Sequence, residues 1–122
     1  MITGAHSIIY SADPEADRSF FKNILKFPNV DIGHGWLIFD LPEADLGCHP
    51  ADEKHGAPSG MADISFYCDD IKKTVAGLKK KGVKFKGKVE DHGYGFVTLF
   101  EVPGNFTIQL YQPKYKKSKK TK

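Results

Sequence analysis

The chain has 122 residues, of which 40% are hydrophobic and 12% are aromatic. A chain of this length supports one hydrophobic core, and this composition excludes a disordered or fibrous protein. Because no apolar run approaches the ~20 residues of a membrane span and the N-terminus lacks the features of a signal peptide, we expect a cytoplasmic protein.

The positive charge of the chain is concentrated at its C-terminus. The formal net charge is +3, but the last nine residues contain six lysines and no acid. The rest of the chain contains 12 basic and 15 acidic residues and is therefore net negative. We predict one folded domain over residues 1–113 and a disordered lysine-rich tail over 114–122. Such a tail can attract polyanions, but neither a membrane nor a nucleic acid is an expected partner of the acidic folded part.

A strand and a helix are predicted at the start of the chain. In AHSIIYS, polar and apolar residues alternate around His6, Ile8 and Tyr10, which predicts a strand. Ser11 or Asp13 can cap the helix that follows. The helix has one apolar face for packing on a sheet, formed by Phe20, Phe21, Ile24 and Leu25.

The same strand and helix recur 57 residues later, so that His6 corresponds to Asp63 and Tyr10 to Tyr67. The second helix is predicted to end at Gly82, where a left-handed C-cap is favourable. Its buried face is predicted to contain Ile71, Val75 and Leu78, and its opposite face is rich in lysine.

The remaining parts of the two copies correspond at an offset of 60 residues. In each, a Gly-rich loop precedes a strand, a tight turn and another strand. The predicted strands include 36–41 and 96–102, with shorter ones around Val30 and at 83–85. The chain therefore contains two βαβββ units, about 1–50 and 61–113, joined by a linker over about 50–60.

These repeats predict an α+β fold in which two tandem βαβββ units form a curved, cup-like sheet with the helices outside. Strand alternation then separates the inward side chains from those that face the helices. The row Phe106, Ile108 and Leu110 is apolar, so Thr107, Gln109 and Tyr111 face the other way. The inward set from the first strands is His6, Ile8, Tyr10, Asp63, Ser65 and Tyr67.

The ordered series of segments resembles the vicinal oxygen chelate superfamily, which includes glyoxalases, bleomycin-resistance proteins and extradiol dioxygenases. The resemblance covers residues 4 to 113 through GAHSIIYS, SFFKNILKF, ISFYCDDIKKTVAGLKKKGVKF and VPGNFTIQLYQP. It implies the paired βαβββ fold, a homodimer and a small-molecule ligand in the cup. In the enzymes of this family, a divalent metal in the cup binds two neighbouring oxygens of the substrate.

The resemblance implies a metal site built from His6, His49 and Asp63, with Gln109 as a fourth ligand or a hydrogen-bonding neighbour. Asp63 stands where histidine is commonest in the family, and Gln109 stands where most members have glutamate. Two imidazoles and a carboxylate suit Fe, Zn, Mn or Ni. The alternative for His6 is a histidine at the edge of the core, hydrogen-bonded to Tyr67 or Gln109.

Two functions remain open from the sequence. The first is a metal-dependent lyase, isomerase or dioxygenase acting on a substrate with vicinal oxygens. The second is a metal-free protein that sequesters an aromatic drug or metabolite. In both, the ligand pocket is expected to contain Tyr10, Trp36, Tyr67, Phe96 and Tyr111, with His34 and His92 in loops at its mouth or simply solvated. Cys48 and Cys68 are expected to be buried, reduced thiols.

Overall fold

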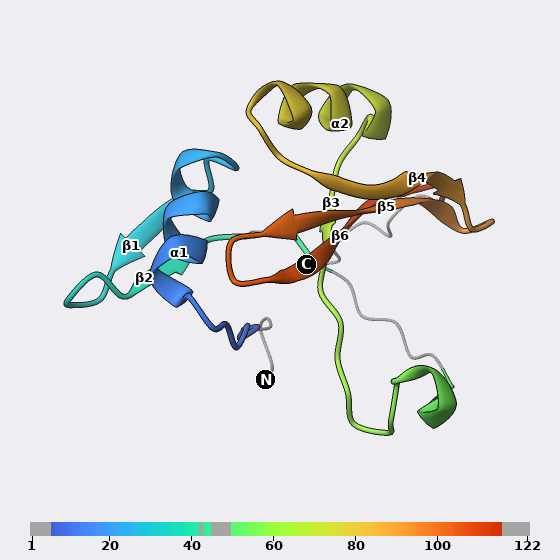
Figure 1. Ribbon diagram of the computed structural model, residues 1–122, viewed down its shortest axis with the longest axis horizontal. Coiled ribbons are helices and arrows are strands. Elements are labelled where there is room, and N and C mark those ends of the chain that lie inside the picture. The colour runs from blue at the N-terminus through green and yellow to red at the C-terminus, as the bar shows by residue number, and fades with distance from the viewer. Residues whose placement is uncertain (1–5, 42, 45–49, 116–122) are drawn as a thin grey trace, which may run out of the picture.

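A computed structural model describes residues 6–41, 43–44 and 50–115 of the chain (Figure 1). The second half forms a complete β-α-β-β-β unit, as the repeat predicts. Its elements in chain order are β3 (Ser65–Tyr67), α2 (Ile71–Lys80), β4 (Phe85–Asp91), β5 (Gly95–Val102) and β6 (Phe106–Pro113). Its sheet has the order β3-β6-β5-β4, in which β3 is parallel to β6 and the other pairs are antiparallel.

The described residues of the first half contain fewer strands than the repeat predicts. They form α1 (Pro14–Asn23) and a two-stranded sheet of β1 (Asn29–Asp31) and β2 (Leu37–Phe39). The prediction of a strand over residues 6–11 is wrong, because this segment pairs with no described strand. A strand needs a neighbour for its peptide groups. In the second half the corresponding strand β3 pairs with β6, and the part of the first half that corresponds to β6, around residues 45–49, lies outside the described residues. The linker contains a short 3₁₀ helix, η1 (Glu53–His55).

Both helices begin at an aspartate. The carboxylate of Asp13 accepts a hydrogen bond from the backbone N–H of Ala16 (3.1 Å), and that of Asp70 accepts one from the N–H of Lys73 (3.1 Å). Each bond satisfies a backbone donor that has no partner within its helix. At the other end of α2, Gly82 has a φ of 89°, which confirms the predicted left-handed C-terminal residue.

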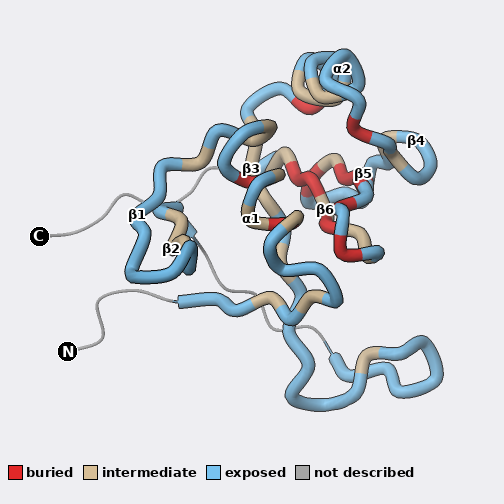
Figure 2. The backbone as a smooth tube through the Cα atoms, turned by 60° about the vertical axis from the view of Figure 1, so that its left-hand side comes forward, coloured by how far each residue is buried: buried red, intermediate tan, exposed pale blue. Residues whose placement is uncertain are grey.

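The hydrophobic core lies between the two helices and one face of the four-stranded sheet. Phe21 of α1 and Ile71 of α2 are both buried in it, together with Phe100, which is 1% exposed. Figure 2 shows the buried positions concentrated along β5 and β6, whereas β1 and the η1 segment are exposed. The other buried members of the cluster are Val83, Val102, Ile108 and Leu110.

A buried carboxylate joins the first half of the chain to the second. Asp17 of α1 is 3% exposed, and its Oδ1 accepts a 2.7 Å hydrogen bond from the backbone N–H of Gly104, in the β5–β6 turn. A side chain at position 104 would collide with Ser11 Oγ and lie 2.7 Å from Asp17 Oδ2. Glycine at 104 therefore lets the turn approach α1 closely enough for the bond to form.

Candidate ligand-binding face

The face of the sheet opposite the helices carries the predicted inward residues of the second unit. Register pairs Ser65 with Gln109 and Tyr67 with Tyr111, so these four side chains point to the same side. Phe106, Ile108 and Leu110 pack toward the core, as predicted from their spacing. We call the opposite side of the sheet the open face, because exposed residues such as Leu99 (38%) lie on it.

Four tyrosines gather at one end of the open face and are called here the tyrosine cluster: Tyr67, Tyr94, Tyr111 and Tyr115. The ring centroid of Tyr111 lies 5.7 Å from that of Tyr67, 5.9 Å from that of Tyr94 and 6.4 Å from that of Tyr115. Tyr111 is buried by its neighbours, whereas Tyr94 is 55% exposed and Tyr115 is 44% exposed. The cluster therefore offers accessible aromatic surface on a partly buried base.

Gly95 makes room for the central ring of this cluster. A Cβ at position 95 would collide with Cε1 of Tyr111 and lie 2.8 Å from the backbone oxygen of Gln112. The ring of Tyr111 thus occupies the space that a side chain at position 95 would fill. The β4–β5 turn is closed beside it, where the backbone N–H of His92 donates to the carbonyl of Gly95 (2.9 Å).

Charged side chains border the tyrosine cluster. Lys114 Nζ lies 2.6 Å from Asp91 Oδ2, and the pKa of Asp91 is lowered by this hydrogen bond first and by the N–H of Gly93 second. His92 Nε2 lies 3.0 Å from Glu90 Oε1, and its ring is 6.1 Å from that of Tyr94. Acidic and basic side chains therefore lie close to the aromatic surface.

Two polar side chains follow the cluster along the open face. Gln109 Nε2 donates a 2.9 Å hydrogen bond to Ser65 Oγ, which joins β6 to β3 through side chains. Ser65 is exposed and Gln109 is half-buried. This pair can offer hydrogen bonds to the polar part of a molecule whose aromatic part lies on the tyrosines.

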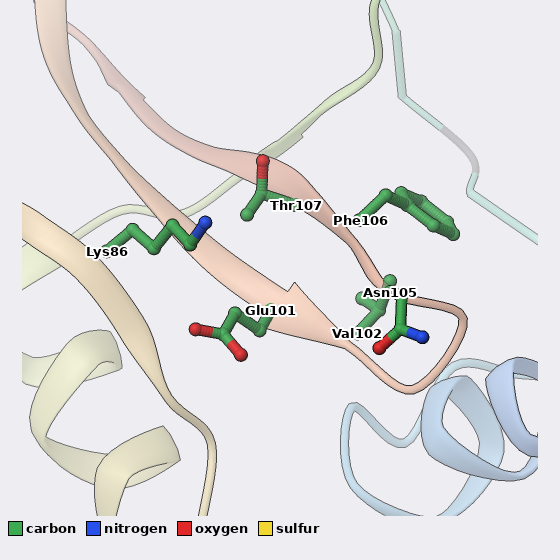
Figure 3. A pocket seen from close by; sticks show the side chains of 6 residues that line it. All are labelled: Lys86, Glu101, Val102, Asn105, Phe106 and Thr107. Atoms are coloured by element: carbon green, nitrogen blue, oxygen red, sulfur yellow. The ribbon is translucent and has the colours of Figure 1, made fainter.

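A polar recess lies at the far end of the same strands, beside the β5–β6 turn (Figure 3). Its volume is about 220 Å³, and it contains one cation, Lys86, and one carboxylate, Glu101. The other lining residues are Val102, Asn105, Phe106 and Thr107. Because the recess is shallow and both charged side chains are exposed, it is a weaker candidate for the main site than the tyrosine cluster.

Two of the three expected metal ligands lie within the described residues. His6 and Asp63 are both exposed, and each lies outside a strand. His49 lies outside the described residues, so the three-ligand set cannot be assembled from the described part of the chain. Within that part, no group of three or more His, Cys, Asp or Glu side chains is close enough to hold a metal.

Two of the expected pocket residues, Tyr67 and Tyr111, contact each other in the tyrosine cluster. Tyr10 lies outside the cluster and is 90% exposed. Trp36 also lies outside it, and the guanidinium of Arg18 is 5.4 Å from the centroid of the Trp36 ring. Phe96 packs against the core, with Lys114 Nζ 4.7 Å from its ring. His34 is exposed in the β1–β2 loop, with a φ of 55°.

Sequence reasoning missed two members of the cluster, Tyr94 and Tyr115. The sequence Gly-Tyr-Gly at 93–95 was a usable signal, because the two glycines allow a tight turn that presents the tyrosine between them. Tyr115 falls within the predicted tail, and its ring centroid lies 6.4 Å from that of Tyr111. The signal for Tyr115 was only its position just after the last strand.

Cys68 lies just after β3 and packs against the hydrophobic core. It is a free, half-buried cysteine whose Sγ lies 3.8 Å from the carbonyl oxygen of Tyr111. Burial raises the pKa of the thiol, so the reactive thiolate is disfavoured at neutral pH. This environment agrees with the structural role expected for Cys68, whereas Cys48 lies outside the described residues.

Together these features define a small α+β protein in which a βαβββ unit presents an aromatic surface on the open face of a curved sheet. The family model for the Glyoxalase/Bleomycin resistance protein/Dioxygenase superfamily matches residues 4–110, so the chain belongs to this superfamily. Among curated protein sequences, none matches the chain. None of the described helices is long and apolar enough to span a bilayer.

Solved structures of the same superfamily share this fold. TnmS3, an antibiotic binding protein from Streptomyces sp. CB03234, is 21% identical, with coverage of 93% of this chain and 100% of its own and a TM-score of 0.63. A superfamily member from Sphaerobacter thermophilus is 27% identical, with coverage of 91% and 98% and a TM-score of 0.60. Lactoylglutathione lyase from Agrobacterium tumefaciens is 13% identical, with coverage of 85% and 88% and a TM-score of 0.60.

Proposed function

We propose that this protein binds a small aromatic molecule on the tyrosine cluster. The observation that carries this proposal is the exposed aromatic surface of Tyr94 and Tyr115 around the buried ring of Tyr111. A planar ligand would stack on these rings, and each aromatic contact contributes about 0.5–1.5 kcal/mol beyond the area it buries. The Gln109–Ser65 pair supplies hydrogen bonds to a polar substituent.

The similarity to TnmS3, which is named as an antibiotic binding protein, supports the proposal of ligand binding. A protein that sequesters a ligand requires a binding surface and no catalytic group. We propose the same class of function here: capture of an aromatic drug or metabolite. The shape of the aromatic surface, open at Tyr94 and Tyr115, suits a planar molecule better than a flexible aliphatic one.

The second candidate is a metal-dependent lyase or dioxygenase, and the lactoylglutathione lyase fold neighbour favours it. His6, His49 and Asp63 would hold a divalent metal, with Gln109 beside it, since two imidazoles and a carboxylate have the right donor chemistry. His6 and Asp63 are exposed and accessible to an ion. A bound metal would act as a Lewis acid toward a substrate with vicinal oxygens.

One experiment separates the two candidates. The purified protein is analysed for first-row metals and titrated with 2-naphthol as the aromatic probe, with backbone NMR shifts as the readout. We expect shifts around the tyrosine cluster and an affinity about 3- to 10-fold lower in Tyr94→Ala, which removes one stacking ring. Tyr10→Ala is the matched control, because Tyr10 is exposed but lies outside the cluster.

An equal loss of affinity in Tyr10→Ala, or no shift near Tyr111, would contradict binding on the tyrosine cluster. Stoichiometric metal in the wild-type protein that disappears in His6→Ala would support the metal-dependent enzyme. Metal that is unaffected by His6→Ala would remove that assignment of the ligands, whatever the result of the naphthol titration.

We further propose a cytoplasmic homodimer. Several large apolar side chains of the first half are exposed, and a second copy would cover them. These residues are Ile8, Ile32 and Trp36. Sedimentation equilibrium should give the mass of two chains, and the double variant Ile8→Asp, Ile32→Asp should give that of one; a single-chain mass for the wild-type protein at 100 µM, about the concentration used in NMR, would contradict the dimer.

A further inference from the structure

The outer side of α2 is covered by lysines. Lys72, Lys73, Lys79 and Lys80 fall within a sector of about 120° when residues are placed every 100° around the helix. This sector is opposite Ile71 and Leu78, which pack toward the core. All four lysines are exposed, and Figure 1 shows α2 at the periphery of the molecule, away from β1 and β2. We call these four residues the lysine face.

The lysine face is part of a larger separation of charge. Residues 71–89 contain eight lysines and no acid, whereas residues 1–70 contain 12 acidic and four basic residues. Among the described residues, no ion pair includes any of the eight lysines. The negative charge expected for the folded part is therefore an average over an acidic first half and a lysine-rich segment at 71–89.

The arrangement of these lysines opposes helix stability. Lys72 and Lys73 lie in the first turn of α2, where the positive end of the helix dipole disfavours cations. In the corresponding turn of α1 the chain has Glu15 and Asp17 instead. Repulsion among neighbouring lysines adds to this cost, because no acid lies three or four residues away within the helix.

The centre of the lysine face is also unusual. In the sequence, Ala76 and Gly77 lie between the two pairs of lysines, and both are exposed. Around the helix, Ala76 lies at the centre of the sector and Gly77 about 40° beyond its edge at Lys73. A Cβ at position 77 would meet nothing within 4 Å, so close packing does not require glycine there. Glycine within a helix costs about 1 kcal/mol relative to alanine. The result is a low surface flanked by cations, which gives an extended anion close access to the helix.

We propose that the lysine face binds the phosphate backbone of duplex nucleic acid. Three properties favour this partner over others. Lysine contacts phosphates as a point charge, and the only arginine, Arg18, lies on α1, so bidentate reading of bases is not expected from this face. Between residues 62 and 93 no large hydrophobic side chain is highly exposed, so the face lacks both stacking rings for single strands and apolar anchors for a membrane.

Binding should be weak, sequence-independent and strongly dependent on salt. Each phosphate contact releases bound counterions, so the logarithm of the affinity falls with the logarithm of the salt concentration with a slope of about −0.9 per contact. Three lysines removed from the face should reduce the magnitude of this slope by about 2–3. They should also lower the affinity at 50 mM salt by about tenfold or more.

The test is fluorescence anisotropy with a labelled 20-base-pair DNA, on the full chain, from 50 to 200 mM NaCl. The test variant is Lys72→Gln, Lys73→Gln, Lys80→Gln; Lys79 is retained because its Nζ lies 6.0 Å from the Phe85 ring centroid. A control with the same change in net charge is Lys22→Gln, Lys26→Gln, Lys54→Gln. A third variant retains Lys114, which pairs with Asp91, and replaces the other five tail lysines with glutamine: Lys116, Lys117, Lys119, Lys120 and Lys122.

The proposal predicts a loss of affinity and a smaller salt slope for the lysine-face variant alone, with circular dichroism unchanged. Equal losses in the control would show a net-charge effect and overturn it. Binding that depends only on the tail variant would overturn it too. Absence of DNA binding at 50 mM salt, or binding to phosphatidylserine vesicles in place of DNA, would exclude this partner.

Discussion

Replacing Phe100 by alanine is expected to lower the free energy of unfolding by about 3–5 kcal/mol. Phe100 is 1% exposed, and its ring lies within 6.0–6.3 Å of those of Phe20, Phe66 and Phe85. Removing the ring leaves a cavity among side chains from α1, β3 and β4, which cannot all move inward together. Urea denaturation followed by circular dichroism measures the change.

The matched control for this substitution is Leu99→Ala, one residue earlier in β5. Leu99 points to the open face and is 38% exposed, so we expect a loss well below that of Phe100→Ala. Equal effects of the two substitutions would contradict the assignment of the faces of β5, and with it the placement of the tyrosine cluster.

Replacing Gly95 by alanine is expected to destabilise the fold by about 1–3 kcal/mol and to weaken binding of 2-naphthol. The added methyl group meets the Tyr111 ring and the backbone oxygen of Gln112, so relief requires a shift of β6 as well as of a side chain. Movement of Tyr111 would disturb its contacts with Tyr67 and Tyr94.

Gly77→Ala is the control for Gly95→Ala and should have the opposite sign. The new methyl group meets no atom within 4 Å, and α2 should gain about 0.5–1 kcal/mol from the higher helix propensity of alanine. Both variants are compared by urea denaturation and naphthol titration. Stabilisation by Gly95→Ala would show that position 95 has room for a side chain and that Tyr111 does not lie over it.

Much of the second half could be predicted from sequence because its signals are local. Asp70 caps α2 and Gly82 follows its end, as expected from residue types with strong positional preferences. The turn at 103–105 was also correct, and Asn105 has a φ of 66°. The alternation of β6 correctly placed Tyr111 and Gln109 on the open face.

The failures concern features that depend on distant parts of the chain. Residues 6–11 alternate like a strand, but pairing depends on a neighbouring strand, which the alternation of one segment does not specify. Tyr94 and Tyr115 join the tyrosine cluster through the folding of a turn and a chain end around Tyr111. Metal binding by His6 and Asp63 remains a prediction, because their partner His49 lies outside the described residues.

The hydrogen bond between Asp17 and Gly104 makes the duplicated halves mutually dependent. Although each copy repeats the same pattern, the amide of one turn relies on a carboxylate contributed 87 residues earlier, and Phe21 from the first copy completes the interior of the second. Neither copy is therefore self-sufficient. A fragment containing only residues 61–113 would lack both Asp17 and Phe21. The repeat unit visible in the sequence is therefore not the unit that folds.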